Sequence, residues 1–400
     1  MSDLTKMVAG LRADTSQVNW PDAVEVRTRA DRRTRRRWVA AAAAVSVAIA
    51  VTGGAYLTGG RRNTAPAGPG VAAQLPLDAI ASAPSGTIFA ITHTCGTGKC
   101  SVGAQRHYTL LRSNDLARSW ATVTSLDDVA GGTDVDLELA VADDDVLWIA
   151  NGTRFMGSVD GGTHWSNWNL GADPTQSKGG GLAGTTLWLA YNGQVLRATD
   201  GGRPAPTSGQ PPGSGQIDSV AAVSADSSIA LRAEGSRKGW YRTSDRGAHW
   251  SVAADPCAGL SHPNVTGAYL TAGQDGGLWA VCFVAGGRAP GWQIATSADG
   301  GHSWQPHPGG APGGDDVQPV SATVAWRTGN GNGPDVYRTT DSGAHWTDVA
   351  HLPPGASIQG GFVRDADTAL YVLPEPGTDH VTLHLTTDGG TTWTTLPFSP

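Results

Sequence analysis

The chain has 400 residues, of which 16% are charged, and its 55 glycines and 15 tryptophans favour an all-β protein with many tight turns over a disordered chain. Residues 1–37 carry nine Lys or Arg and five Asp or Glu, a net of +4 within a total of −7, so the remainder carries −11. That acidic remainder has no basic footprint, which excludes nucleic acid as a partner.

Residues 38–58 are predicted to form one transmembrane helix. The uncharged run WVAAAAAVSVAIAVTGGAYL (38–57) has about the length that crosses a hydrocarbon core of ~30 Å. The run RRTRRR (32–37) precedes it and predicts a cytoplasmic N-terminus. A cleaved secretory signal is the alternative, but the leader is long and no convincing A-x-A site follows. We therefore expect a basic cytoplasmic tail at 1–37, an anchor at 38–58 and a Gly/Pro linker at 59–75.

From about residue 76 the chain repeats an eight-residue pattern, S/T-x-D-x-G-x-x-W, which we call the box. The aspartates of successive boxes are 45, 40, 45, 54, 42 and 47 residues apart, a period typical of a propeller or a solenoid. The seven boxes are SNDLARSW (113–120), SVDGGTHW (158–165), ATDGGRPA (198–205), TSDRGAHW (243–250), SADGGHSW (297–304), TTDSGAHW (339–346) and TTDGGTTW (386–393).

A short apolar run with an aromatic residue precedes most boxes and is typical of a buried strand. The fourth unit has only SIALR (228–232). Further apolar stretches lie before these runs and on both sides of each box, so every unit supplies about four strands, the content of one propeller blade. The runs are TIFAI (87–91), VLWIA (146–150), TLWLA (186–190), GLWAV (277–281), TVAWR (323–327) and ALYVL (369–373). We predict a seven-bladed propeller of four-stranded antiparallel blades over residues 76–400.

The box is predicted to hold a hairpin turn between the third and fourth strands. Its Asp accepts backbone N–H bonds, its Gly adopts a backbone angle that other residues resist, and its Trp buries a large face. One Asp in each box is too few oxygen ligands for calcium, so we expect neither a metal nor a cofactor. The predicted structural residues are Asp115, Asp160, Asp200, Asp245, Asp299, Asp341 and Asp388, with Trp120, Trp165, Trp250, Trp304, Trp346 and Trp393.

Two boxes depart from the pattern. Ala117 occupies the Gly position of the first box, so that turn should be strained or differently shaped. The third box lacks both the initial Ser or Thr (Ala198) and the Trp (Ala205), and a Pro/Gly/Ser stretch follows at 203–216. We expect the third blade to be the least regular, with a short or missing outer strand.

The boxes resemble the Asp-box, also called the bacterial neuraminidase repeat, of sialidase-like propellers. The resemblance covers about 320 residues, and six of the seven boxes keep the Trp. It implies the propeller fold. Activity does not follow from it, because such repeats also occur in non-catalytic sorting receptors and assembly factors.

A sialidase would imply an arginine triad, a Tyr nucleophile paired with Glu, an Asp acid/base, and an Arg-Ile-Pro motif before the first box. No such motif occurs between residues 76 and 112, and the predicted propeller holds only Glu138, Glu234 and Glu375. Glu138 lies on a predicted inner strand and is the best catalytic candidate, with Asp134 and Asp136 as neighbouring carboxylates. Arginines recur just before the box in four blades, a repetition that indicates a structural or surface role, at Arg112, Arg197, Arg242 and Arg338.

All four cysteines, Cys95, Cys100, Cys257 and Cys282, follow the apolar segment. An even number on the external side predicts two disulfides, for which three connectivities are possible. Pairing Cys257 with Cys282 would tie the loop after the fourth blade to the second strand of the fifth.

These features together predict a single-pass protein of the bacterial cell membrane with its propeller on the outer side. Its function is expected to be recognition of a protein or glycan by loops around the central channel, namely those that enter the first strands and those that join the second and third. An exo-α-sialidase-type glycoside hydrolase is the rival function, and a chaperone or assembly factor is a third. An apolar channel mouth would favour protein binding, whereas an Arg cluster beside a Tyr–Glu pair would favour the enzyme.

Overall fold

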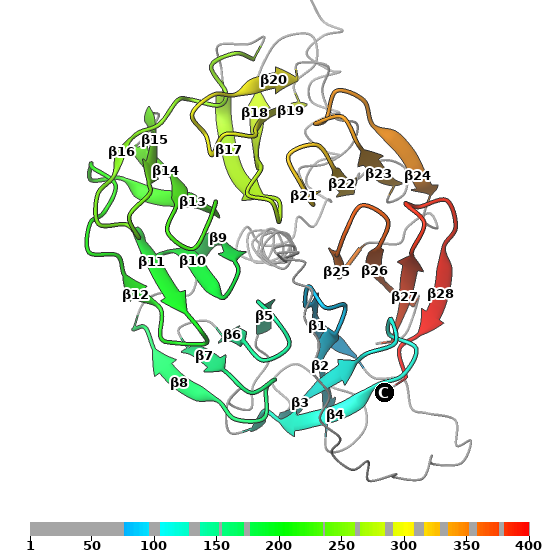
Figure 1. The fold of residues 1–400 in the computed structure, drawn as a ribbon. Helices are drawn as coiled ribbons and strands as arrows, with labels where there is room; N and C mark the ends of the chain where they lie inside the picture. Colours follow the sequence, from blue (N-terminus) through cyan, green and yellow to red (C-terminus); the bar gives the residue numbers. More distant parts are fainter. Residues whose placement is uncertain are drawn as a thin grey trace, which may run out of the picture. The chain divides into compact units, whose positions relative to one another are not determined.

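The computed structural model describes residues 76–95, 105–127, 137–151, 154–171, 177–234, 237–260, 265–284, 291–307, 316–328, 335–351, 358–375 and 380–399. They form seven four-stranded antiparallel sheets, which confirms the predicted all-β, seven-bladed propeller (Figure 1). No helix among these residues has the length and hydropathy needed to cross a membrane. The predicted tail, anchor and linker (1–37, 38–58 and 59–75) lie outside the described residues.

Each blade consists of four strands that follow one another in the sequence, and the first of them lies nearest the centre (Figure 1). The innermost strands are β1 (Leu77–Ser82), β5 (Leu137–Val141), β9 (Ser177–Ala183), β13 (Gln216–Ala222), β17 (Val265–Ala272), β21 (Asp316–Pro319) and β25 (Gly360–Val363). The second strands are β2 (Ile88–Cys95), β6 (Leu147–Asn151), β10 (Thr186–Tyr191), β14 (Ser228–Glu234), β18 (Leu278–Val284), β22 (Ala325–Thr328) and β26 (Ala369–Pro374).

The third and fourth strands flank the boxes. The third strands are β3 (Arg106–Ser113), β7 (Arg154–Ser158), β11 (Gln194–Thr199), β15 (Arg237–Thr243), β19 (Gly291–Ser297), β23 (Asp335–Thr339) and β27 (Val381–Thr386). The outer strands are β4 (Ala121–Ser125), β8 (Ser166–Asn169), β12 (Ala205–Pro206), β16 (Ser251–Val252), β20 (Gln305–His307), β24 (Thr347–His351) and β28 (Thr394–Pro397). The outer strand of blade 3 is short, as predicted, and that of blade 4 is equally short although its box is intact.

The second strands place large side chains against the next blade. In each apolar run one residue pairs across the sheet with the residue that precedes the box, and both point to the same side. In five blades this residue is aromatic and almost fully buried, at Phe89, Trp148, Trp188, Trp279 and Trp326. The indole N–H of Trp148, Trp188 and Trp279 donates to a backbone carbonyl of the following blade. The predicted buried strands therefore also form the seams between blades.

The box tryptophans complete these seams from the other side. Each of the six packs into the apolar cluster of the preceding blade. Trp346 lies 6.3 Å, centroid to centroid, from Trp279 of blade 5, and Trp393 lies 6.4 Å from Trp326 of blade 6. Such edge-to-face pairs add about 0.5–1.5 kcal/mol beyond the area they bury. Every intact box therefore stabilises its own hairpin and also its attachment to the previous blade.

The ring closes by the same kind of contact, a box tryptophan packed on the preceding blade. No strand is shared between the first and last blades, because each sheet takes its four strands from one continuous stretch. Instead Trp120 of the first box packs edge-to-face on Phe398, at the end of blade 7, with 5.4 Å between ring centroids. Leu385 and Leu383 of blade 7 belong to the same cluster. Closure thus depends on side-chain packing between blades 7 and 1.

The seam between blades 2 and 3 is different, because the third box has no Trp. In blade 2, Gly157 occupies the position that holds arginine in four other blades. A Cβ atom there would lie 1.9 Å from the carbonyl oxygen of Gly201 in the third box. The backbone of this box thus approaches blade 2 directly, and the indole N–H of Trp148 donates to the Gly202 oxygen at 3.0 Å. The closer contact thus coincides with two departures from the repeat, Gly157 in the arginine position and Ala205 in the tryptophan position.

Gly157→Ala should lower the free energy of unfolding by about 1–3 kcal/mol, because overpacking against rigid backbone forces neighbouring atoms to shift. Thermal and urea unfolding would measure the change. Gly291→Ala is the matched control, since a Cβ atom at Gly291 would meet nothing within 4 Å. Equal stability of the two variants would contradict the close contact between blades 2 and 3.

Candidate functional site

The box of blade 5 shows how the conserved positions of the repeat work together. The Ser297 hydroxyl donates to Asp299 Oδ1 at 2.7 Å and accepts the Gly301 N–H at 2.9 Å. The same Oδ1 accepts the Ser303 N–H at 2.9 Å, and Asp299 Oδ2 accepts the Ser303 hydroxyl at 2.6 Å. One hydroxyl and one carboxylate therefore bind the turn at four points, which closes the hairpin as a side-chain substitute for backbone hydrogen bonds.

This hydrogen-bond pattern recurs in six boxes, those of Asp115, Asp160, Asp245, Asp299, Asp341 and Asp388. The residue before the Trp also contacts the second carboxylate oxygen in each of them. It is Ser or Thr in boxes 1, 5 and 7, and histidine in the other three. The Nδ1 atoms of His164, His249 and His345 lie 2.6, 2.6 and 2.7 Å from their aspartates. These histidines are highly exposed, and each contacts the aspartate of its own box.

Hydrogen bonds to the box carboxylates lower their pKa values. The backbone N–H of His164 contributes most to lowering the pKa of Asp160 to about 2, and that of His345 does the same for Asp341, again to about 2. In Asp299 the Ser303 hydroxyl contributes most to the lowered pKa. Donors stabilise the ionised form, so these carboxylates stay charged at neutral pH and are poor proton donors.

The first box keeps the common turn despite its substitution. Leu116 and Ala117 have φ angles of 60° and 64°, in the left-handed region. The other regular boxes place either two glycines there or a polar residue followed by a glycine. The Ala117 N–H still donates to the Ser113 hydroxyl at 3.0 Å. Of the two predicted outcomes, strain or a different shape, the structure shows the strained version of the same turn.

The third box forms a different turn. The residues with positive φ are Asp200 and Gly201, one position earlier than in the other boxes. The Asp200 carboxylate accepts the hydroxyl of Thr185 and makes none of the box contacts. After the two-residue strand β12, Gln210 binds both the N–H and the carbonyl of Val195, at 2.8 and 3.0 Å. This side chain satisfies the edge of β11 where a longer outer strand would otherwise pair.

The four predicted arginines lie between blades. The guanidinium carbons of Arg112, Arg197 and Arg338 lie 5.6–5.7 Å from the ring centroids of Phe89, Trp188 and Trp326, their cross-strand partners. Their polar atoms reach the following blade, at Asp144, the Ala225 carbonyl and Asp367 respectively. Arg242 contacts His302 of the next box. These arginines do not converge on one point, so they form no carboxylate-binding triad.

The candidate catalytic acids are not brought together among the described residues. Glu138 lies on the innermost strand β5, half-buried, opposite Ala150. Glu375 follows β26, in another blade. Asp134 and Asp136 lie outside the described residues, as does the side chain of Glu234. Within the described ranges no three His, Cys, Asp or Glu side chains are grouped as metal ligands.

Cys257 and Cys282 form a disulfide, with a Cα–Cα distance of 6.1 Å. It joins the loop that follows β16 to strand β18, the pairing considered from the sequence. Both cysteines are almost fully buried in the seam between blades 4 and 5. Cys95 ends strand β2, and Cys100 lies outside the described residues.

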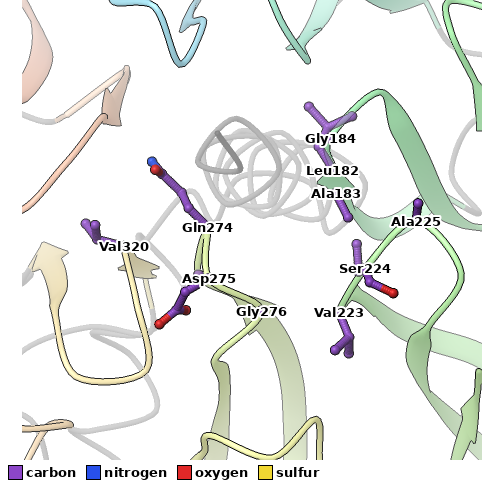
Figure 2. Close-up of a pocket in the computed structure, with 12 residues that line it drawn as sticks. Leu182, Ala183, Gly184, Val223, Ser224, Ala225, Gln274, Asp275, Gly276 and Val320 are labelled. Carbon is purple, nitrogen blue, oxygen red and sulfur yellow. The ribbon is translucent and has the colours of Figure 1, made fainter. Parts of the chain in front are cut away.

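A pocket of about 550 Å³ lies where the turns between the first and second strands of blades 3 to 6 meet (Figure 2). We call it the turn-face pocket. Val223 and Val320 are the half-buried aliphatic residues of its lining, whereas Leu182, Ala183 and Ala222, also in the lining, are buried. These residues carry no motif, and sequence reasoning did not single them out. The close packing of small residues at the ends of β9 and β13 forms the wall, and only the folded ring brings these turns together.

The polar side chains of the turn-face pocket already have partners. Ser224 Oγ accepts the N–H of Ser227 at 3.0 Å. The Asp275 carboxylate accepts the N–H groups of Gly277 and Ala322, at 2.8 and 3.0 Å. The Gln274 side-chain amide donates to the Arg364 carbonyl of blade 7. The pocket therefore offers shape and apolar surface, and its described lining includes no Arg cluster and no Tyr–Glu pair.

The turn-face pocket lies at the end of the propeller that carries the boxes. Thr87, in the β1–β2 turn, donates to Asn114 of the first box, which shows that the two kinds of turn share one end. The sequence analysis placed binding at the opposite end, on loops that enter the first strands or join the second and third. Most of those loops lie outside the described residues. That placement stays a prediction, and the described pocket is a second location.

Comparison with known proteins identifies propellers of several functions. No protein-family model matches the chain. A curated xyloglucanase of a Paenibacillus species is 28% identical over 285 residues, which are 58% of this chain and 27% of that protein. The chain thus spans about a quarter of the length of the curated relative it matches.

Two solved structures support the fold. The GH74 xyloglucanase of Xanthomonas campestris superposes with a TM-score of 0.51 at 16% identity, over 80% of this chain and 53% of that one. PorZ, a surface component of the type-IX secretion system of Porphyromonas gingivalis, superposes with a TM-score of 0.50 at 14% identity, over 82% and 39%. At these identities the likeness shows the propeller fold alone.

Asp160→Asn should make the protein less stable at neutral pH but not in strong acid. The folded pKa of Asp160 is about 2, below the unfolded value of about 3.9. Its contribution to stability is therefore complete above pH 4 and is lost as the pH falls towards 2. Melting temperatures of both proteins between these limits would measure it. A difference that stays constant down to the lowest pH would contradict the assigned role of this carboxylate.

Proposed function

We propose that this chain is an extracytoplasmic recognition propeller that binds another protein at the turn-face pocket. The observation that carries the proposal is the lining of the pocket, in which aliphatic side chains form the wall and the polar side chains already hold their own turns. Such a site can bury an apolar side chain of a partner. It supplies no paired acid and base for chemistry.

A protein ligand fits this pocket better than a glycan. Sugars are bound by stacking on aromatic rings and by side chains that offer free hydrogen bonds. The residues described around the pocket include no aromatic ring. Its polar groups on Ser224 and Asp275 face backbone N–H donors of the protein itself. The described lining therefore offers a sugar neither an aromatic ring for stacking nor a free hydrogen-bonding side chain.

The disulfide supports a location outside the cytoplasm. Cys257 and Cys282 are buried and joined, and such bonds persist in oxidising compartments. A membrane anchor at residues 38–58, with the basic tail inside, would hold the propeller on the outer face of a bacterial membrane. We keep this topology as part of the proposal.

We also propose that the boxes are Asp-boxes of the sialidase-like type. The shared geometry of Ser or Thr and Asp in six turns, five of them with Gly and one with Ala117, supports this assignment, because one hydrogen-bond pattern serves all six. In these turns the aspartates bind backbone and neighbouring side chains. Membership of this repeat class would thus explain the fold and contribute no catalytic carboxylate.

A glycoside hydrolase is the second candidate, favoured by the similarity to the Paenibacillus xyloglucanase. Glu138 is the acid best placed for it, since it lies half-buried on an innermost strand. Hydrolysis with either stereochemical outcome needs a second carboxyl group within about 5–10 Å. Of the other acids considered, Glu375 lies in another blade, and Asp134 and Asp136 lie outside the described residues.

A photo-crosslinking amino acid at Ala225, on the rim of the turn-face pocket, should give a discrete protein adduct in intact bacterial cells. The same amino acid at Ala344, an exposed alanine in the sixth box, should give none and serves as the control. Denaturing gels would read out both.

Two results would count against this function. One is equal labelling at both positions. The other is turnover of xyloglucan or a fluorogenic sialoside by the purified protein that Glu138→Gln abolishes, which would establish the hydrolase instead.

A further inference from the structure

The turn-face pocket has the size and lining for one aliphatic side chain and the backbone on either side of it. Its volume is about 550 Å³, and Leu182, Ala183, Val223 and Val320 lie around it (Figure 2). Burying a Leu or Ile side chain in such a site strengthens binding by roughly ten- to a hundredfold. An aliphatic residue is thus the part of a partner that this wall selects.

The charge beside the pocket is negative. Asp275 is the one residue with a formal charge among those that line it. Its carboxylate accepts two backbone N–H groups, and no Lys, Arg or His of the described residues forms an ion pair with it. Backbone donors leave the charge in place, so the wall next to the apolar surface keeps a field that attracts cations.

The surrounding turns add to this field. Two of their arginines pair with carboxylates, Arg246 with Asp226 at 2.7 Å and Arg364 with Asp365 at 2.8 Å, whereas Arg197 donates to the Ala225 carbonyl. Asp145, in the turn between β5 and β6 of blade 2, is exposed and adds a further negative charge. The six box carboxylates lie on the same end of the propeller, and their hydrogen bonds keep them ionised. Among the described residues, a partner that approaches this end meets more carboxylates than Lys and Arg side chains.

We propose that the occupant of the turn-face pocket is a basic peptide segment of a partner protein, which inserts one aliphatic side chain and places Lys or Arg beside Asp275. This proposal rests on the recognition function above and adds the chemistry of the partner. The aliphatic side chain supplies the burial, and the flanking cations supply orientation and selectivity against acidic segments.

Three fluorescein-labelled peptides test the proposal against the full-length protein by fluorescence anisotropy. The first carries Leu between pairs of lysines in a Gly/Ser background, the second has glutamates in place of lysines, and the third has Ser in place of Leu. The Lys–Leu peptide should bind about tenfold or more tightly than either other peptide. Its affinity should fall when the salt concentration rises from about 50 mM to about 500 mM.

Ala225→Trp fills the pocket without changing charge, and it should abolish binding of the Lys–Leu peptide. Ala344→Trp, on the same end of the propeller but away from the pocket, should leave binding unchanged. Asp275→Asn should reduce the preference for the lysine peptide while Leu still binds better than Ser. This variant keeps the test decisive if the Trp variant proves unstable.

The outcomes separate the partner's chemistry from the proposed function. If the glutamate peptide binds as tightly as the lysine peptide and Ala225→Trp abolishes both, the basic partner is wrong while recognition at the pocket stands. If no peptide binds, or binding survives Ala225→Trp in a folded protein, the assignment of this pocket to a basic aliphatic segment is overturned.

Discussion

Each regular blade depends on one carboxylate that closes the turn between its third and fourth strands. In the fifth box Asp299 holds the turn through the Ser303 N–H and hydroxyl and the Ser297 hydroxyl. The closed turn directs the following Trp304 into the apolar cluster of blade 4. The local hydrogen bonds and the packing between blades are thus consequences of the same eight residues. This coupling gives the eight-residue pattern a structural role in every regular blade.

The seams between blades show how the packing between blades adjusts when a residue of the repeat changes. In blades 1, 3 and 6 an arginine covers an aromatic ring and reaches a polar partner in the next blade. In blade 2 a glycine replaces the arginine, and the next box has lost its Trp. The box backbone then fills the space itself, with Gly201 against Gly157. The irregular third blade is therefore a repacked seam, and the ring remains continuous through it.

The sequence was sufficient for the features that repeat and insufficient for those that occur once. Seven boxes and the apolar runs before them predicted the blade count and the buried strands, because each unit obeys the same local rules. The contact between Gly157 and Gly201 could not be predicted, since it joins residues that no local rule relates. The pocket at Leu182, Val223 and Val320 was missed for the same reason. The apolar run of blade 7 also contains an aromatic residue, Tyr371, but it lies one position later than the residue equivalent to Trp326. Its side chain therefore packs towards blade 6.

The box carboxylates serve folding, and removing one of them tests this role most directly. Asp299→Ala leaves four donors of its turn without their acceptor, so it should lower the free energy of unfolding by about 1–2 kcal/mol. Asp200→Asn, in the third box, keeps a residue that tolerates the positive φ of this position and alters only the contact with Thr185, so it should change the free energy of unfolding by less than about 0.5 kcal/mol. Chemical denaturation of both variants beside the parent protein would measure the difference. Equal effects of the two substitutions would contradict the claim that the box, through its carboxylate, builds the blade.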